Sequence, residues 1–337
     1  MVDRIISFTR AGALLVFGTF ALAGCGVEHA NVSFDVNAQG TALAFSSADG
    51  DLYLLQLSSR SVERLTQSNI EESTPAFSPD GQRVAYSAEV ASESRSLFEY
   101  SLTSRATRRL TSQDGVRDLA PRYSSDGSRI VFTRAHRLRP YSMGGKTWDD
   151  WDLYVIERDA SPRRLTFQNS RSPNEACFID GGQRILFSGG GQNERLDPEL
   201  YELGLDATAQ TPRAVEVVVA NTDRRGGAWA TDVNVSNNGA LATFLSDRAE
   251  PFQYDVYVMP LESKTPLPLN VTTVAHYNQN PRFAADGKSV WFLAGTEQNR
   301  GSRAIFSLWR VNLADRKLEQ IADSGLFTNP ARWRPRN

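Results

Sequence analysis

After residue 30, apolar residues come in short runs broken by Gly, Asp, Asn and Ser, and no stretch places them at sustained helical spacing. Several segments that contain an aromatic residue end in Asp-Gly or Asn-Gly. These dipeptides are the strongest short signal for a β-hairpin, because the turn requires a positive φ. Runs of β-branched and aromatic residues follow, such as Arg-Ile-Val-Phe at 129–132. The pattern predicts an all-β chain.

Four predicted strands recur together along the chain. The first two flank a turn glycine, the third opens with an apolar-aromatic pair such as Leu52-Tyr53, and the fourth carries Arg-Leu-Thr in three of the copies. The turn glycines follow one another at intervals of 41, 46, 55, 57 and 48 residues. They are Gly40, Gly81, Gly127, Gly182, Gly239 and Gly287. Four strands per repeat, six times over, predict a six-bladed β-propeller of four-stranded blades.

The C-terminal segment 329–335 looks like the start of a seventh copy. We expect it to form a single strand that completes the first blade and closes the ring. A seven-bladed ring is the weaker alternative, because a lone strand cannot bury both of its faces.

The first thirty residues predict an export signal. A short basic start is followed by an apolar run at 11–22 and by the sequence Leu-Ala-Gly-Cys that ends at Cys25. The run is too short to span a bilayer, so residues 1–24 are predicted to be a signal peptide. The ending resembles the lipobox of bacterial lipoproteins, which implies a lipid anchor on Cys25, a short tether at 25–31 and a propeller at 32–337. The alternative is an ordinary cleaved signal with a cysteine nearby.

The resemblance to lipoproteins also implies a location in the bacterial cell envelope. In Gram-negative lipoproteins an Asp after the lipidated cysteine retains the protein at the inner membrane. Here Gly26 and Val27 follow Cys25 instead. We therefore expect an outer-membrane lipoprotein, and both the periplasmic face and the cell surface stay open.

The repeats themselves resemble a known family. The sequence Pro-x-Phe-Ser-Pro-Asp-Gly at 75–81, the Leu-Tyr-x-x-x-Leu segment at 52–57 and the Arg-Leu-Thr segments are similar to the WD40-like (PD40) repeats of the TolB propeller family. The resemblance spans about 32–337 and implies the propeller fold. It implies less about function, because the same repeat occurs in periplasmic scaffolds, peptidase propellers and sugar-lyase propellers.

Composition and motifs exclude several function classes. With 37 basic and 39 acidic residues the formal charge is -2, so the chain lacks the basic field of a nucleic-acid-binding protein. It has no Gly-x-Ser-x-Gly motif, and His136 and His276 fall in loops of different blades, without the clustered ligands that zinc requires. We expect no catalytic residue, no metal and no other cofactor. Once Cys25 is lipidated, Cys177 remains as a lone thiol, which we expect to be buried.

The longest insertion, 135–151, is predicted to be a loop between the second and third strands of the third blade. Such loops emerge on the same propeller face as the connections between blades. The loops of this long-loop face are rich in Trp, Tyr and Arg, which are enriched at binding hot spots. Its candidate binding residues are Arg137, Arg139, Tyr141, Trp148, Trp151, Trp229, His276 and Tyr277. The alternative is that the tryptophans of the insertion pack back onto the neighbouring blade.

The innermost strands supply a second candidate site. Five positions before successive turn glycines stand Ala76, Arg122, Cys177, Asn234 and Arg282, and the predicted C-terminal strand adds Arg332. If the arginines point into the channel, they form a partly basic collar suited to a carboxylate or an acidic peptide. The alternative is that each arginine pairs with a nearby Asp or Glu between blades.

Two functions therefore remain open. The first is a monomeric, lipid-anchored scaffold of the cell envelope that binds an envelope protein or peptide through the long-loop face. The second is a carbohydrate-binding or lyase-like propeller that stacks a glycan on its aromatic side chains. The lack of a recognisable catalytic set favours the first.

Overall fold

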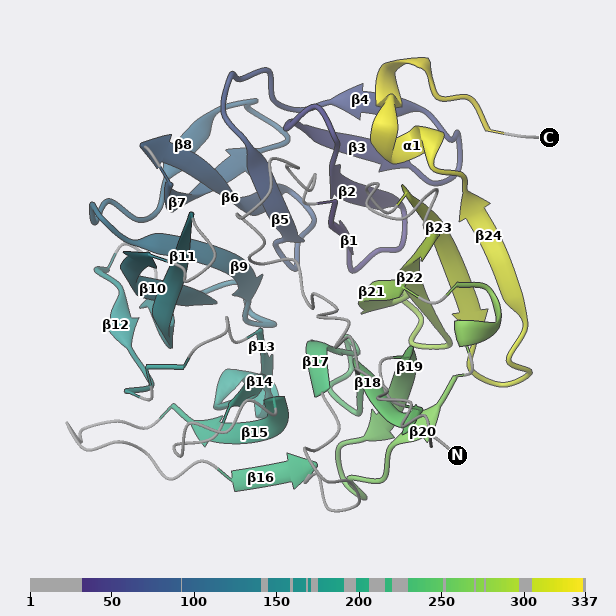
Figure 1. Cartoon of the computed structure of the whole chain (residues 1–337). Coiled ribbons are helices and arrows are strands. Elements are labelled where there is room, and N and C mark those ends of the chain that lie inside the picture. The colour runs from purple at the N-terminus through teal and green to yellow at the C-terminus, as the bar shows by residue number, and fades with distance from the viewer. Residues whose placement is uncertain are drawn as a thin grey trace, which may run out of the picture.

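The computed structural model describes residues 32–335, apart from 92, 141–144, 158–159, 168, 171–174, 191–197, 206–215, 220–229, 251–252, 270, 276 and 297–304. Its sheets are arranged radially around a centre, with β1, β5, β9, β13, β17 and β21 innermost (Figure 1). The predicted all-β propeller is confirmed. The signal peptide, Cys25 and the tether lie outside the described residues.

Each group of four consecutive strands forms an antiparallel unit in sequence order. The first unit is β1 (Phe34–Val36), β2 (Ala42–Ser46), β3 (Leu52–Gln56) and β4 (Val62–Arg64). The second is β5 (Glu72–Phe77), β6 (Arg83–Ala91), β7 (Ser94–Ser101) and β8 (Thr107–Arg109), and the third is β9 (Arg117–Tyr123), β10 (Arg129–Pro140), β11 (Lys146–Glu157) and β12 (Arg163–Arg164).

The remaining strands follow the same order. The fourth unit is β13 (Ala176–Ile179), β14 (Arg184–Gly190), β15 (Pro198–Gly204) and β16 (Glu216–Val219). The fifth is β17 (Ala230–Val235), β18 (Leu241–Glu250), β19 (Gln253–Pro260) and β20 (Leu267–Pro268), and the sixth is β21 (Tyr277–Phe283), β22 (Ser289–Thr296), β23 (Ile305–Asn312) and β24 (Leu318–Ala322). The second and third units make one eight-stranded sheet, because a parallel bridge between Arg95 and Arg117 joins β7 to β9.

The core lies between the units. Long stretches of the middle strands are buried, and β2 (Ala42–Ser46) is buried along its whole length, because both faces of a sheet are covered by its neighbours. Six clusters of buried apolar residues each combine two successive units, and one of them combines the sixth unit with the first. Burial on both faces explains why these strands read as continuous apolar runs in the sequence.

The Arg-Leu-Thr motif has a structural role in this arrangement. In the first unit the hydroxyl of Thr66 accepts a hydrogen bond from the backbone N–H of Leu52 at 2.9 Å, and Arg64 forms an ion pair with Asp51. The third unit repeats the pattern, since Thr166 accepts from the N–H of Leu153 at 2.9 Å. In the three units that have it, the motif therefore ties the segment after the outermost strand to the start of the third strand.

The C-terminal segment differs from the prediction. Residues 329–335 form no strand, because a 3₁₀ helix (Pro330–Arg332) lies there, directly after α1 (Gly325–Thr328). Two further 3₁₀ helices are Asp180–Gly182 and Val271–Thr273. The expected closure of the ring by a C-terminal strand is therefore wrong. Pro330 cannot donate a ladder hydrogen bond and its fixed φ suits the first turn of a helix.

The helical C-terminus nevertheless bridges the two ends of the chain. Phe327 packs edge-on against Phe45 at 5.4 Å between ring centroids, and its carbonyl accepts hydrogen bonds from the N–H of Ala48 and the hydroxyl of Ser47. Near the centre the innermost strands of the sixth and first units meet, where the N–H of Phe34 donates to the side chain of Asn280 at 2.9 Å (Figure 1). In the described residues no helix has the length and apolar character needed to cross a bilayer.

Candidate binding site at the long hairpin and the central channel

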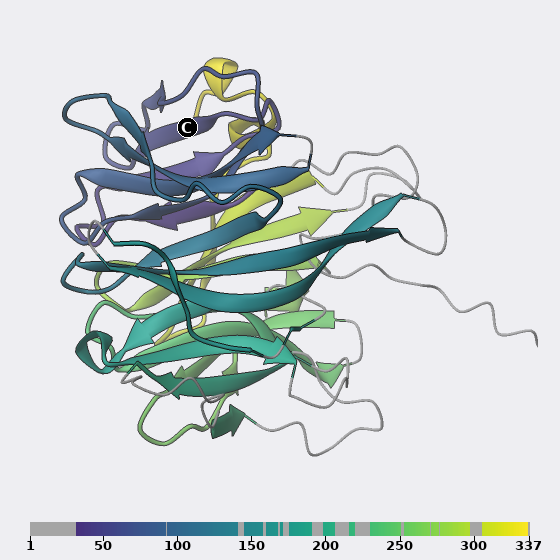
Figure 2. The ribbon, with the colours of Figure 1, turned by 90° about the vertical axis from the view of Figure 1, so that its left-hand side faces the viewer.

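The insertion at 135–151 is not a loop. Strands β10 and β11 continue through it as one antiparallel hairpin, paired as far as Pro140 and Lys146. In Figure 2 this dark teal hairpin reaches beyond the strands that flank it. The prediction of a loop failed because cross-strand pairs such as Arg137 with Asp149 become visible only when the register is known.

The tryptophans anchor the base of this hairpin. Trp151 is only 2% exposed and packs with Leu119, Ala120 and Ala135, and half-buried Trp148 packs against the same cluster. The indole N–H of Trp151 donates to the carbonyl oxygen of Trp148 at 3.2 Å. The prediction of Trp151 as a contact residue of the surface is wrong. Both tryptophans pack back onto the protein, but against residues of their own unit and not onto the neighbouring blade that the alternative named.

The arginines of the hairpin point outward but are not free. Arg139 Nε lies 2.8 Å from an oxygen of buried Asp149, and Arg137 lies 3.4 Å from the same carboxylate and 3.0 Å from that of Asp150. The two guanidinium groups stay 44% and 58% exposed. Lys146 reaches Glu93 of the second unit at 3.4 Å. The hairpin therefore presents exposed cations whose positions are fixed by carboxylates.

The other candidates of the long-loop face are only partly placed. Tyr277 begins β21 in the innermost layer of the sixth unit. Tyr141, Trp229 and His276 lie outside the described residues.

Arg122 and Arg282 are in the innermost strands, as predicted, whereas Arg332 is not. Arg332 lies exposed in the C-terminal 3₁₀ helix, so its inclusion in the collar is wrong. Sequence reasoning also missed Asp35, which stands five positions before the first turn glycine. Its carboxylate lies 3.9 Å from Nε of Arg282 and accepts a hydrogen bond from the N–H of Phe77 at 2.8 Å.

The collar carries charges of both signs. Arg282 is 1% exposed, and burial together with nearby Arg122 lowers the pKa of its guanidinium. Burial and the adjacent carboxylate of Asp232 raise the pKa of Glu175 well above its usual range. Each arginine donates to a proline carbonyl beside it, at 2.8 Å from Arg282 and 3.1 Å from Arg122. The partly basic collar that the sequence suggested therefore also carries acids, and for Arg282 the alternative of pairing with an acid of the neighbouring unit applies.

Hydrogen bonds at a second level, two positions before the collar residues, link several neighbouring innermost strands. Thr74 accepts from the N–H of Ala120 at 3.2 Å, Asp232 accepts from the N–H of Asn280 at 2.9 Å, and Ser33 accepts from the N–H of Thr74 at 2.9 Å. All of these residues stand seven positions before a turn glycine, so aligned repeats could have revealed them. Thr74, Ala120, Asp232 and Asn280 share a positive φ, which marks a bulge in each strand.

Cys177 belongs to the same inner layer, and its predicted burial is confirmed. Its thiol donates to the carbonyl of Val233 in the next unit at 3.4 Å. Burial raises the pKa of the Cys177 thiol. A thiol in this setting stays protonated and serves packing.

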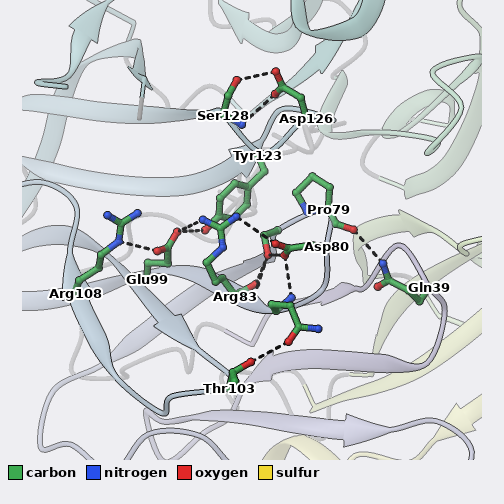
Figure 3. Close-up of polar contacts among 12 residues, drawn as sticks. Gln39, Pro79, Asp80, Arg83, Glu99, Thr103, Arg108, Tyr123, Asp126 and Ser128 are labelled. Atoms are coloured by element: carbon green, nitrogen blue, oxygen red, sulfur yellow. Dashed lines mark hydrogen bonds and ion pairs between the residues drawn. The ribbon is translucent and has the colours of Figure 1, made fainter. Parts of the chain in front are cut away.

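The ends of the second and third units that lie away from the long hairpin hold the polar network of Figure 3. Glu99 accepts hydrogen bonds from Arg108 Nε at 2.7 Å and from the Tyr123 hydroxyl at 2.6 Å, and Arg83 lies 3.4 Å away. Burial alone would raise the pKa of Glu99, but the bonds from Arg108 and Tyr123 outweigh it and lower that pKa. The network joins the two units and leaves its carboxylate fully engaged.

The comparisons with known proteins agree with the fold. No protein-family model matches the chain. Over 217 residues it is 23% identical to the Tol-Pal system protein TolB of Wolinella succinogenes, which covers 64% of this chain and 44% of that protein. The crystal structure of TolB from Acinetobacter baumannii matches with a TM-score of 0.60 and 17% identity over 85% of this chain and 62% of that one. The chain is similar to TolB.

The resemblance to TolB propellers predicted from the repeats is thus confirmed, although the chain spans less than half the length of its curated TolB relative. An oligogalacturonate lyase in complex with manganese shares the fold, with a TM-score of 0.61 and 14% identity over 88% of this TolB-like chain and 78% of the lyase chain. Among the described residues no group of three or more His, Cys, Asp or Glu side chains could hold a metal ion.

Proposed function

We propose that this TolB-like chain is a lipid-anchored propeller of the bacterial cell envelope that binds an envelope protein or peptide through its long-loop face. The observation that carries the proposal is the β10–β11 hairpin. Its base is fixed by buried Trp151, and its outer part carries Arg137, Arg139 and Lys146. The hairpin reaches beyond the strands that flank it (Figure 2). A rigid projecting element loses little conformational entropy on binding, which favours recognition of a partner.

The proposed propeller has six blades. The eight-stranded sheet divides into two antiparallel groups, β5–β8 and β9–β12, and in the described residues the bridge between Arg95 and Arg117 is the one strand pairing between them. Each of the six units also has its own buried cluster with the unit that follows it. We infer a monomer, since each unit is covered by neighbours from the same chain.

The proposed anchor is a lipid on Cys25, placed by the Leu-Ala-Gly-Cys sequence. The named TolB relative belongs to the Tol-Pal system, which supports an envelope location. Expression in a Gram-negative host with a radiolabelled fatty acid tests the anchor. The wild-type chain should carry label and fractionate with outer membranes, whereas a Cys25→Ser variant should carry none. Equal labelling of both would refute the anchor.

The binding role is tested by shortening the hairpin without disturbing its base. Leu138 and Trp148 face each other across the strands, so 139–147 can be replaced by Asn-Gly, a dipeptide suited to a two-residue turn. This removes Arg139, Tyr141 and Lys146 and keeps the tryptophan packing. Unmodified and shortened chains, both carrying Cys25→Ser, serve as baits in solubilised envelope, and captured proteins are identified by mass spectrometry.

The expected result is a protein that the unmodified bait captures and the shortened bait loses, at unchanged melting temperature. Equal capture by both baits would place the interface elsewhere. If neither bait captures a protein, the scaffold proposal fails, and the carbohydrate-binding alternative is tested next by thermal shift with acidic oligosaccharides.

A further inference from the structure

A cavity of about 360 Å³ lies between the first and second units. Its walls include Glu72 from β5, Tyr86 from β6, and Phe98 and Tyr100 from β7. The connection from the first unit, with exposed Ile70, forms its rim. The cavity therefore combines one carboxylate with three aromatic side chains.

The third unit has a buried ion pair at the positions that correspond to Glu72 and Ala88 of the second unit. Asp118 lies opposite Arg134, whose Nε and Nη2 donate to the two carboxylate oxygens at 2.6 and 2.8 Å. The guanidinium lies over the rings of Phe132 and Tyr154, at 5.4 and 4.7 Å from their centroids. Both charged side chains are buried. The guanidinium thus forms an ion pair with the carboxylate and cation–π contacts with the aromatic pair.

The second unit repeats this arrangement without the cation. Glu72 lies opposite Ala88 in the same register in which the third unit has its ion pair. Tyr86 and Phe98 are cross-strand partners with ring centroids 5.8 Å apart, as the corresponding aromatic pair is in the third unit at 5.6 Å. Ala88 stands at the repeat position that Arg134 has in the third unit, but its side chain is only a methyl group. The cavity lies next to this methyl group.

In the fifth unit a guanidinium also lies over the aromatic pair, although no acid stands at the position that corresponds to Glu72 and Asp118. Arg248 lies over Phe244 and Tyr257, at 5.5 and 5.3 Å from their centroids. In the third and fifth units the aromatic pair is therefore covered by an arginine of the same unit. In the second unit the pair of Tyr86 and Phe98 faces the cavity instead.

We propose that the cavity between the first and second units binds a guanidinium group supplied by a ligand, either a free arginine-like molecule or an arginine side chain of a peptide. The guanidinium takes the place that Arg134 occupies in the third unit. It donates to Glu72 and lies on the rings of Tyr86 and Phe98, while its aliphatic stem leads past Ile70 to solvent.

The charges around Glu72 fit this assignment. Its carboxylate is 4% exposed and accepts hydrogen bonds from the hydroxyls of Thr66 and of Ser68, the latter at 3.1 Å. In the part of the chain that the structure describes, no cation forms an ion pair with it. Burial, and to a smaller extent nearby Asp51, raises the pKa of Glu72 to about 7. A buried acid without a counter-ion binds a cation more strongly than a solvated one does.

The other charged groups near Glu72 are engaged elsewhere. Arg64 pairs with Asp51, and buried Arg95 bonds to Glu71. Arg105 also lines the cavity, but its side chain is 73% exposed and pairs with Glu63 at 2.6 Å. These partners leave the carboxylate of Glu72 available for an added cation.

The test uses Nα-acetyl-arginine amide and its neutral, nearly isosteric analogue Nα-acetyl-citrulline amide. Isothermal titration at pH 8 with the Cys25→Ser chain should detect binding of the arginine compound and at least tenfold weaker binding of the citrulline compound. Below the pKa of Glu72 the acid must lose a proton to bind, so affinity should fall between pH 8 and pH 6. An arginine-containing peptide that binds much more tightly than the amide would identify a peptide as the source.

Two variants separate recognition from folding. Glu72→Gln keeps the shape of the side chain and should abolish the preference for arginine over citrulline. Ala88→Arg supplies the missing cation from within, so it should raise the melting temperature and block the ligand. The shortened hairpin should bind the arginine compound normally, which makes this site independent of the proposed partner interface.

Three outcomes would overturn the proposal. They are equal binding of both compounds, no binding of either at millimolar concentration, and unchanged arginine binding by a folded Glu72→Gln variant.

Discussion

The packing of Phe327 predicts that the C-terminus carries a large share of the stability of the ring. The side chain is 1% exposed, belongs to the cluster shared by the first and sixth units, and meets Phe45 edge-on. Replacing a buried Phe by Ala typically costs about 3–5 kcal/mol, through lost apolar contact and the cavity left behind. Because the other residues of this cluster come from several strands of the first and sixth units, they have little freedom to collapse into the space, so we expect the upper part of this range for Phe327→Ala.

Urea unfolding followed by circular dichroism measures this loss. Phe167→Ala is the matched control, since Phe167 is 44% exposed and contacts Arg164 at 4.5 Å, a surface cation–π contact that contributes about 1 kcal/mol or less. If Phe327→Ala also costs less than about 1 kcal/mol, the helical C-terminus does not hold the ring together and the reasoning is refuted.

Three further predictions concern buried polar groups. Arg134→Met leaves Asp118 buried without its partner and should lower the free energy of unfolding by about 3–5 kcal/mol, whereas the double variant with Asp118→Leu should recover much of the loss. Glu72 has a raised pKa of about 7, so the folded state holds its proton more tightly and stability falls as pH rises from about 4.5 to 7. Glu72→Gln should therefore stabilise the protein at pH 8 by up to about 3 kcal/mol and have little effect at pH 4, as seen in melts at both pH values. Cys177 should react with a thiol reagent only as fast as the protein unfolds; immediate labelling of the native chain would contradict its burial.

The fold could be predicted from the sequence because its signals are local. The hairpin at Gly81 needs a positive φ, and the structure gives it 68°. The Arg-Leu-Thr segment fixes the position of Thr66 against Leu52, fourteen residues earlier. Signals of this kind are complete within one repeat, so counting repeats was enough to reach a propeller.

The site could be predicted only in part, because its residues depend on pairing between strands. The insertion looked like a loop, yet its residues pair across two long strands, and Trp151 serves packing. Asp35 was missed although it occupies the same repeat position as Arg282. The cavity beside Glu72 depends on what stands opposite it, and Ala88 becomes informative only when the second and third units are compared residue by residue.

The hydrogen bond between Phe34 and Asn280 has a consequence for how the molecule assembles. The two residues are 246 positions apart, so this contact forms only after nearly the whole chain is available. Contacts of such long sequence separation slow folding, because the chain must close a large loop before they can form. Until then the first and the latest completed unit each present an uncovered apolar face. A chain that is threaded through a membrane from its N-terminus would hold these faces exposed for the entire passage, and would depend on chaperones until its last unit arrived.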